Sequence, residues 1–110
     1  MYIYNVTTNV DETIQEKWLN WMKSQHIPNM LSTEKFSKAK MSKVLIEEEM
    51  GGVTYAVQYT TDSLETLEEF YTEFAEKLLN EATKLFGTKI LMFTTELQVI
   101  AEQYSMSIKN

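Results

Sequence analysis

The sequence predicts an α+β domain in which strands and helices follow one another in the order strand, helix, strand, strand, helix, strand. Residues 2–10 and 53–60 are rich in β-branched and aromatic side chains and alternate with the period of two that is typical of a strand. Apolar residues recur at intervals of three and four over residues 64–85, which indicates a long amphipathic helix. Paired glycines at positions 51 and 52 separate two extended runs and predict a hairpin between them.

The first helix is predicted directly after the first strand. Asp11 is a residue type that caps helix N-termini, and apolar side chains follow it at helical spacing. We expect this helix to end near Gln25, because Pro28 disfavours helical backbone in the residue before it. His26 and Ile27 should then be extended or form a turn. The apolar stripe, whose expected role is core packing, consists of Ile14, Trp18, Trp21 and Met22.

The middle of the chain predicts a hairpin. Residues 29–35 should form an irregular connection that can include a short helical turn. Residues 36–50 are a long run of mixed polarity that we interpret as a strand. Gly51 and Gly52 supply the positive φ that a tight two-residue turn requires, and the alternating strand over residues 53–60 follows them.

The second helix and the last strand complete the pattern. Asp62 and Glu65 have the spacing of a capping box, Gly87 ends the helix, and residues 89–100 form the last strand. The helical stripe consists of Leu64, Leu67, Tyr71, Phe74, Leu78, Ala82 and Leu85. Two right-handed β-α-β units joined by a hairpin predict a ferredoxin-like βαββαβ fold, with a four-stranded antiparallel sheet and both helices on one of its faces.

The chain length fits one domain. Its 110 residues can bury a single core. We expect one ferredoxin-like domain over residues 1–103. The chain is polar from Ala101 onward, and residues 104–110 should form a loose C-terminal tail.

Composition excludes several classes of function. The net charge is −6, so we expect no nucleic-acid partner. Every basic residue is lysine, which argues against a site built around a phosphorylated or nucleotide ligand, although lysine and helix N-termini can also hold anions. The absence of cysteine excludes disulfides and thiolate metal sites. No signal peptide or membrane-length apolar run is present, so the expected location is the cytoplasm, with no membrane partner. We expect no metal and no cofactor.

The face of the sheet that carries no helix is predicted to be nearly uncharged. A sheet face open to water usually alternates apolar with charged residues, and an uncharged face is usually covered. We assign to it Ile3, Asn5, Thr7, Thr54, Ala56, Gln58, Thr60, Ile90, Met92, Thr94, Glu96, Gln98 and Ile100. The simplest cover is a second copy, so the sequence predicts a homodimer through this open sheet face, enclosing a barrel-like cavity. A mildly polar, solvated face is the alternative.

Several motifs resemble the uncharacterised proteins grouped as domain-of-unknown-function family 4286. They are Tyr4-Asn5-Val6-Thr7, Trp18, Trp21-Met22, His26-Ile27-Pro28, Glu48-Glu49-Met50-Gly51-Gly52-Val53-Thr54-Tyr55, Gln58-Tyr59 and Thr95-Glu96-Leu97. The resemblance runs from Met1 to about Gln103. It implies the dimeric α/β-barrel superfamily, whose members include small-substrate monooxygenases, lactone isomerases and stress-response proteins. It implies no particular activity, because fold does not determine function.

His26, the only histidine, is a weak candidate for catalysis or ligand binding. The resemblance implies that a histidine near this helix end can orient a substrate oxygen or shuttle a proton, a task that suits imidazole. The structural alternative is that His26 caps the C-terminus of the helix and fixes the turn before Pro28.

Glu96, Asn5, Gln58 and Thr94 are the other weak candidates for ligand binding, as carboxylate and hydrogen-bonding groups lining a cavity on the open face. Cross-strand pairing is the alternative role of the amide and hydroxyl groups, and an ion pair or solvent contact that of Glu96.

Three functions therefore stay open. The first is a small homodimeric ligand-binding or regulatory domain for a small, mostly apolar molecule. The second is a cofactor-independent enzyme of monooxygenase or isomerase type with His26 as acid and base. The third is a structural or interaction protein without a ligand.

Overall fold

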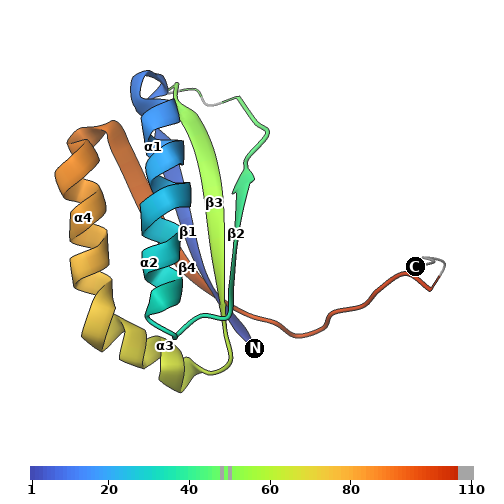
Figure 1. Ribbon diagram of the computed structural model, residues 1–110. Helices are drawn as coiled ribbons and strands as arrows, with labels where there is room; N and C mark the ends of the chain where they lie inside the picture. The colour runs from blue at the N-terminus through green and yellow to red at the C-terminus, as the bar shows by residue number, and fades with distance from the viewer. Residues whose placement is uncertain (48, 50, 107–110) are drawn as a thin grey trace.

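The computed structural model describes residues 1–47, 49 and 51–106 and has a four-stranded antiparallel sheet with two long helices on one face (Figure 1). The first helix consists of α1, a π-turn over Met22–His26, and α2; the second consists of α3, a π-turn over Tyr71–Ala75, and α4. The elements are β1 (Tyr2–Val10), α1 (Gln15–Trp21), α2 (Ile27–Ser32), β2 (Lys38–Lys43), β3 (Val53–Thr61), α3 (Leu64–Phe70), α4 (Glu76–Phe86) and β4 (Ile90–Gln98).

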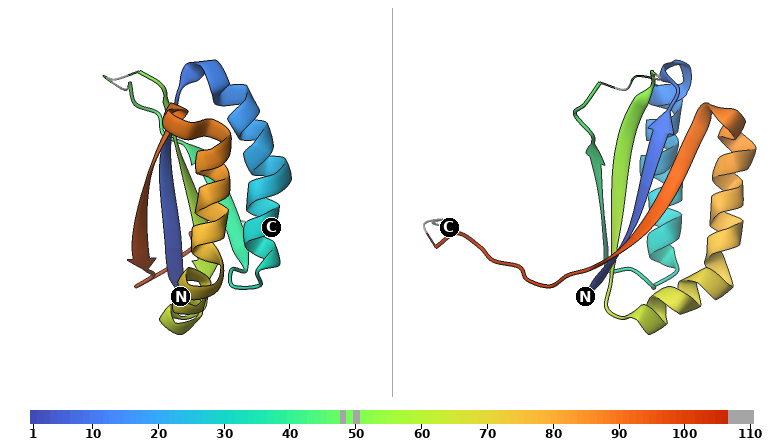
Figure 2. Two further views of the ribbon diagram at one scale, coloured as in Figure 1. Left: turned by 90° about the vertical axis from the view of Figure 1, so that its left-hand side faces the viewer. Right: turned by 180° about the vertical axis from the view of Figure 1, so that it is seen from behind.

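The strand order β2-β3-β1-β4 confirms the ferredoxin-like α+β prediction. β1 lies in the middle, with Tyr4 opposite Tyr59 of β3 and Glu96 of β4. β2 and β4 are the two edges of the sheet. Figure 2 shows that both helices cover the same face and that the other face carries no helix. This second face is called the open sheet face below.

The core lies between the sheet and the helices. The side chains of Trp18, Leu67 and Phe70 are almost fully buried against alternate residues of β1 and β3. Phe36, just before β2, joins them, with its ring 4.9 Å from that of Phe70 and 5.4 Å from that of Tyr59. Aromatic side chains bury the largest apolar areas, so this cluster contributes much of the stability of the fold.

The first helix does not end before Pro28, as the sequence led us to expect. It continues to Ser32, and His26 and Ile27 are helical. The π-turn explains this difference, because the N–H of Ile27 donates to the carbonyl of Met22 five residues back. The wider turn changes the hydrogen-bond pattern before Pro28, which therefore lies in the first turn of α2. There the missing N–H of proline loses no hydrogen bond within the helix.

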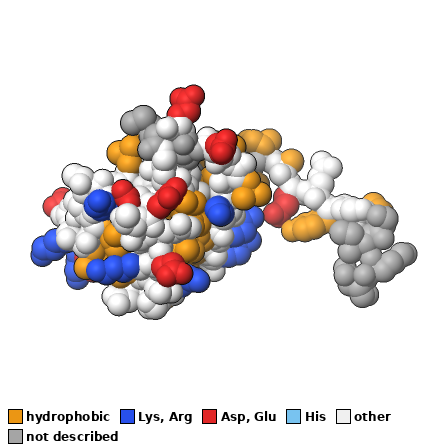
Figure 3. Space-filling view, turned by 90° about the horizontal axis from the view of Figure 1, so that it is seen from above, with side chains coloured by type: hydrophobic (Ala, Val, Ile, Leu, Met, Phe, Trp, Pro, Cys, Tyr) orange, Lys and Arg blue, Asp and Glu red, His pale blue; other side chains and the backbone are white. Residues whose placement is uncertain are grey.

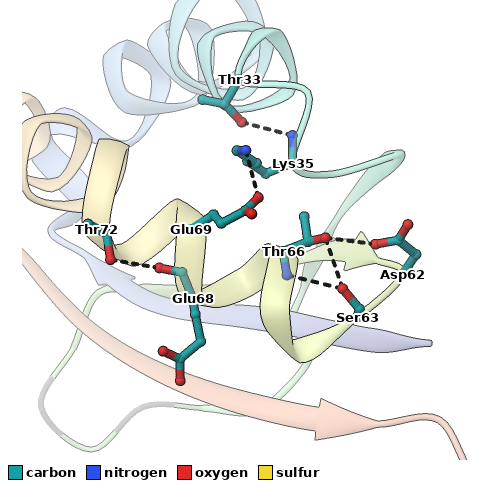
Figure 4. A network of polar contacts seen from close by, with 8 residues as sticks. All are labelled: Thr33, Lys35, Asp62, Ser63, Thr66, Glu68, Glu69 and Thr72. Carbon is teal, nitrogen blue, oxygen red and sulfur yellow. Dashed lines mark hydrogen bonds and ion pairs between the residues drawn. The ribbon is translucent and has the colours of Figure 1, made fainter.

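The start of the second helix also differs from the prediction. Ser63, and not Asp62, is the N-cap, and its hydroxyl accepts a hydrogen bond from the N–H of Thr66 at 3.1 Å. The Asp62 carboxylate accepts instead from the Thr66 hydroxyl (Figure 4). The same view shows Lys35 paired with Glu69 at 2.9 Å, which links the end of the first helix to the start of the second.

The predicted tight turn at Gly51-Gly52 is wrong, although both glycines have a φ of +81°. β2 ends at Lys43, so the connection to β3 runs over residues 44–52; within the predicted strand, Glu48 and Met50 lie outside the described residues. Burial of Phe36 fixes the register, because Ser37 then donates to the carbonyl of Thr60, near the end of β3. In this antiparallel register, β2 lies opposite the first residues of β3 well before the chain reaches Gly51 and Gly52.

The last strand is shorter than predicted and ends at Gln98. Residues 101–106 lie outside helices and strands, and their side chains are exposed. Of the predicted loose tail, residues 107–110 lie outside the described residues. In the part of the chain that the structure describes, no helix is long and apolar enough to span a membrane.

Candidate functional site

An apolar crevice lies between the two helices and the core face of the sheet. We call it the helix–sheet crevice and define it by His26, Trp21, Val6, Ala75, Leu79 and Met92. Its enclosed part has a volume of ≈ 20 Å³, about enough for one water molecule. The volume is ≈ 440 Å³ when the open space at the mouth, which belongs to solvent, is included. The smaller value describes what the crevice holds as it stands, so a larger ligand must widen it.

The crevice opens toward the β4 edge because the second helix does not follow this strand. Figure 2 shows α4 and β4 diverging from their connection at residues 87–89. On the core face of β4, Ile90 is buried, Met92 is half-buried and Thr94 is exposed. Opposite Thr94, Val6 is only half-buried although it belongs to a central strand. The half-buried lining residues Val6 and Met92 therefore lie at the mouth.

His26 is one of the side chains that line the crevice. Its side chain is 9% exposed and its ring stacks on that of Trp21, with centroids 4.8 Å apart and planes inclined by 26°. Trp21 in turn makes an edge contact with Phe86 at 5.4 Å. Among the described residues, no hydrogen bond involves the His26 side chain. The first π-turn ends at His26 and keeps it on the buried side of the helix, so the predicted role as a C-terminal cap is wrong.

Burial lowers the pKa of His26 from 6.5 to about 4. The imidazole is therefore neutral at pH 7, with one ring nitrogen able to donate and the other able to accept a hydrogen bond. A ligand group in the crevice can meet either nitrogen.

The depressed pKa of His26 predicts that the fold weakens in mild acid. Between pH 6.5 and pH 4, His26 of the unfolded chain binds a proton and His26 of the folded chain does not. The contribution of His26 to the free energy of unfolding is therefore complete above pH 6.5 and declines as the pH falls toward 4. From pH 7 to pH 4 it should amount to about 3 kcal/mol of unfolding free energy. Urea unfolding of wild type and His26→Phe at a series of pH values measures it. The difference between the two chains should shift with pH by this amount, and parallel profiles would contradict the prediction.

Glu96 does not lie on the open sheet face, where the sequence analysis placed it. It lies opposite Tyr4, on the core face, and its carboxylate accepts a hydrogen bond from the Tyr71 hydroxyl. Desolvation and this hydrogen bond raise the pKa of Tyr71. Thr94 shares this core face and was misplaced in the same way. The Tyr71–Glu96 pair links the second π-turn to β4, on the strand face that forms the mouth of the crevice.

Asn5 and Gln58 lie on the open sheet face as predicted, directly opposite each other on β1 and β3. The Asn5 side-chain amide donates to the Thr7 hydroxyl at 3.1 Å, and its Oδ1 atom is buried without a hydrogen-bond partner. The predicted site residues thus form no single site. His26 lines the crevice, Thr94 and Glu96 lie on the core face of β4, and Asn5 and Gln58 lie on the opposite side of the sheet.

The open sheet face is more apolar than the sequence analysis assigned. Its β4 residues are Leu91, Phe93, Thr95 and Leu97, of which Leu91, Phe93 and Leu97 are 58%, 61% and 39% exposed. The alternation of β4 was correct, but its two faces were exchanged. The more apolar set looked like the core set, whereas pairing with Tyr4 and Thr8 of β1 turns the other set toward the helices.

The remaining crevice residues were missed. Trp21 was interpreted as core, and Val6, Ala75, Leu79 and Met92 carry no polar signal that marks a site. Among the described residues, no three His, Asp or Glu side chains lie together in a way that could hold a metal ion.

Solved structures share this fold at low sequence identity. A dimeric ferredoxin-like protein from an uncultured marine organism is 13% identical, with a TM-score of 0.70 over 93% of this chain and 97% of its own. An ethyl tert-butyl ether D (EthD) family protein from Bacillus halodurans is 14% identical, with a TM-score of 0.60 over 86% and 97%. A protein from Deinococcus radiodurans, provisionally described as an antibiotic biosynthesis monooxygenase, is 10% identical, with a TM-score of 0.59 over 97% and 100%.

At these identities the likeness shows the fold and no more. No curated protein matches the chain. The model of one family, described as a domain of unknown function, matches residues 1–100. The chain therefore belongs to the family DUF4286.

Proposed function

We propose that this protein is a homodimeric binding protein for a small, mostly apolar molecule held in the helix–sheet crevice. The observation that carries the proposal is His26, a buried imidazole that lines an apolar crevice and has no hydrogen-bond partner among the described residues. Ligand pockets are typically apolar with a few polar groups that fix orientation. The ring nitrogens of His26 are not among the fully buried atoms that lack a partner, so a group that enters the crevice can meet them.

The crevice indicates the chemistry of its ligand. Apolar and aromatic side chains form most of its walls, and the polar groups along it belong to the neutral imidazole and to Thr8, Tyr4 and Tyr59. The ligand is therefore an uncharged, mostly apolar molecule with few hydrogen-bonding groups. It enters beside Val6 and Met92, and α4 moves away from β4 to admit it.

The pKa of His26 favours binding over acid–base catalysis by this residue. General bases work best when their pKa lies near the operating pH, and an imidazole whose pKa is about 4 is a weak base at neutrality. Its hydrogen-bonding capacity is unaffected. The EthD-family and monooxygenase relatives share the fold, but their described activities do not require the same chemistry here.

The open sheet face supports the homodimer. It exposes Leu91, Phe93 and Leu97 along β4. A second copy would cover these apolar side chains. A structural relative that covers 93% of this chain is described as dimeric.

Filling the crevice should abolish binding. Leu79→Trp places a large ring in the crevice, whereas Leu85→Trp makes the same change on the same helix at a side chain that is 55% exposed. We expect N-phenyl-1-naphthylamine, a neutral apolar fluorophore, to bind wild type and Leu85→Trp saturably. Leu79→Trp should bind at least about tenfold more weakly, a change of about 1.4 kcal/mol. Fluorescence titration of the probe measures this.

Two results would contradict the proposed function. One is the absence of saturable probe binding to the folded wild-type chain. The other is equal binding by Leu79→Trp and wild type, which would place the probe outside the crevice. Circular dichroism of all three chains shows whether each is folded before the titration.

A further inference from the structure

We propose that the residues after β4 form a C-terminal arm that adds as an extra strand to the β2 edge of a second copy. The arm is defined as residues 99–106. This inference rests on the homodimer of the proposed function and goes beyond it, because it assigns a second contact, separate from the open sheet face and from the crevice.

Up to Ser105 the arm lies outside helices, strands and turns, Met106 lies in a turn, and the arm stands clear of the body of the protein. Val99 is held to the sheet by its N–H, which donates to the carbonyl of Met1 at 2.9 Å. Figures 1 and 2 show the chain continuing from there past the β2 edge. Ile100, Tyr104 and Met106 are 84%, 79% and 97% exposed. Apolar side chains that stay exposed to water gain none of the free energy of burial unless another surface covers them.

The arm has the side-chain pattern of a strand. In an extended chain alternate residues share a side, so Ile100, Glu102, Tyr104 and Met106 lie together. Three of these four are large and apolar. Glu102 is the single charged residue of the arm. The pattern predicts a strand with one mainly apolar side, and that side also carries one negative charge.

The β2 edge offers a complementary surface. β2 pairs with β3 alone among the described strands, so the peptide groups on its other edge have no strand partner there. Lys38, Lys40 and Lys43 lie on this strand, and neither of the two ion pairs found in the described part of the chain involves them. Lysines on an edge discourage pairing with a neutral strand, but they favour one that carries a carboxylate. Figure 3 shows lysines on the side of the body from which the arm projects.

The geometry points to a second copy and not to the arm's own edge. The arm crosses the end of the sheet and continues outward beyond β2 (Figure 2). To lie along its own β2 it would have to reverse direction, and residues 99–106 contain neither glycine nor proline to make such a turn. In a two-fold dimer the exchange is reciprocal, so two arms add to two edges.

Site-directed cross-linking tests the contact directly, because the chain has no native cysteine. One copy carries Gln103→Cys in the arm, and a second, tagged copy carries Ser42→Cys on the exposed side of β2. A short bismaleimide added to the mixture should link the two chains covalently. The matched control replaces Ser42→Cys with Lys84→Cys on α4, away from the β2 edge, and should give little product. Equal product with both partners overturns the proposal. A further chain carries both Gln103→Cys and Ser42→Cys. If the link forms only within that chain and never between two chains, the proposal is also overturned.

Truncation measures the contribution of the arm. A chain that ends at Val99 should still dimerise through the open sheet face, but with a dissociation constant at least about tenfold higher by sedimentation velocity. An unchanged dissociation constant overturns the arm contact and leaves the homodimer intact. A full-length chain that stays monomeric at all concentrations overturns the homodimer, and the arm contact with it.

Discussion

Replacing Trp18 with alanine should lower the free energy of unfolding by about 3–5 kcal/mol, the range for a large aromatic side chain removed from a core. Trp18 is 1% exposed, and its ring lies 5.2 Å from that of Tyr55 on β3. It joins the first helix to the middle of the sheet, and its loss leaves a cavity that the neighbouring strands cannot close. Urea unfolding followed by circular dichroism measures the change, with all chains at one protein concentration because the proposed dimer would make stability depend on concentration.

Leu85→Ala is the control for this experiment. Leu85 is 55% exposed on the outer side of α4, so its truncation should cost less than about 1 kcal/mol. A loss of the same small size for Trp18→Ala would show that the first helix does not pack on the sheet as described.

Replacing Phe93 with lysine should convert the proposed dimer to a monomer. Phe93 is 61% exposed at the centre of the apolar strip on β4, between Leu91 and Leu97. A two-fold interface contains two copies of this ring, and the substitution puts two desolvated charges in place of two aromatic contacts. We expect the dissociation constant to rise at least about a hundredfold, which is about 3 kcal/mol. Sedimentation velocity over a range of concentrations measures it.

Leu85→Lys adds the same charge to an exposed leucine outside the open sheet face and should leave the association unchanged. Because Phe93 is exposed in the single chain, Phe93→Lys should fold with nearly wild-type stability. A Phe93→Lys chain that dimerises as tightly as wild type would show that the interface is elsewhere.

Much of the fold could be predicted from the spacing of the apolar residues and from the residues that cap or end helices and strands. The alternation of β1 and β3 and the long stripe of the second helix fixed the order of the elements. The errors arose where tertiary contacts decide. Burial of Phe36 set the β2 register, and pairing with β1 set which face of β4 meets the helices. Neither contact is local in sequence, so neither could be found from pattern alone.

The spacing of apolar residues in the sequence does indicate the first π-turn. The buried residues of the first helix are Trp18, Met22, His26 and Met30, a constant spacing of four. An α-helix has 3.6 residues per turn, so a stripe of this spacing drifts off the buried face unless the helix takes up an extra residue. The first π-turn supplies that residue, which is why Pro28 did not end the helix.

The candidate site was harder to predict than the fold. His26 was identified as the only histidine, but its stacking on Trp21 and its place in the wall of the crevice depend on the helix continuing beyond it. The crevice itself results from the divergence of α4 from β4, a property of backbone direction that no short motif encodes. The polar candidates were chosen by residue type, which says nothing about the face on which a side chain lies.

The two π-turns also limit how the length of this chain can vary. Each lies near the middle of its helix, so a one-residue deletion there would restore ordinary α-helical hydrogen bonding at little local cost. It would also rotate everything beyond the turn by about 100° around the helix axis. In the first helix Met30 would leave the core, and in the second Leu78, Ala82 and Phe86 would turn toward solvent. Insertions and deletions that this family accepts should therefore fall in the connections, such as residues 44–52, and not in the middle of either helix.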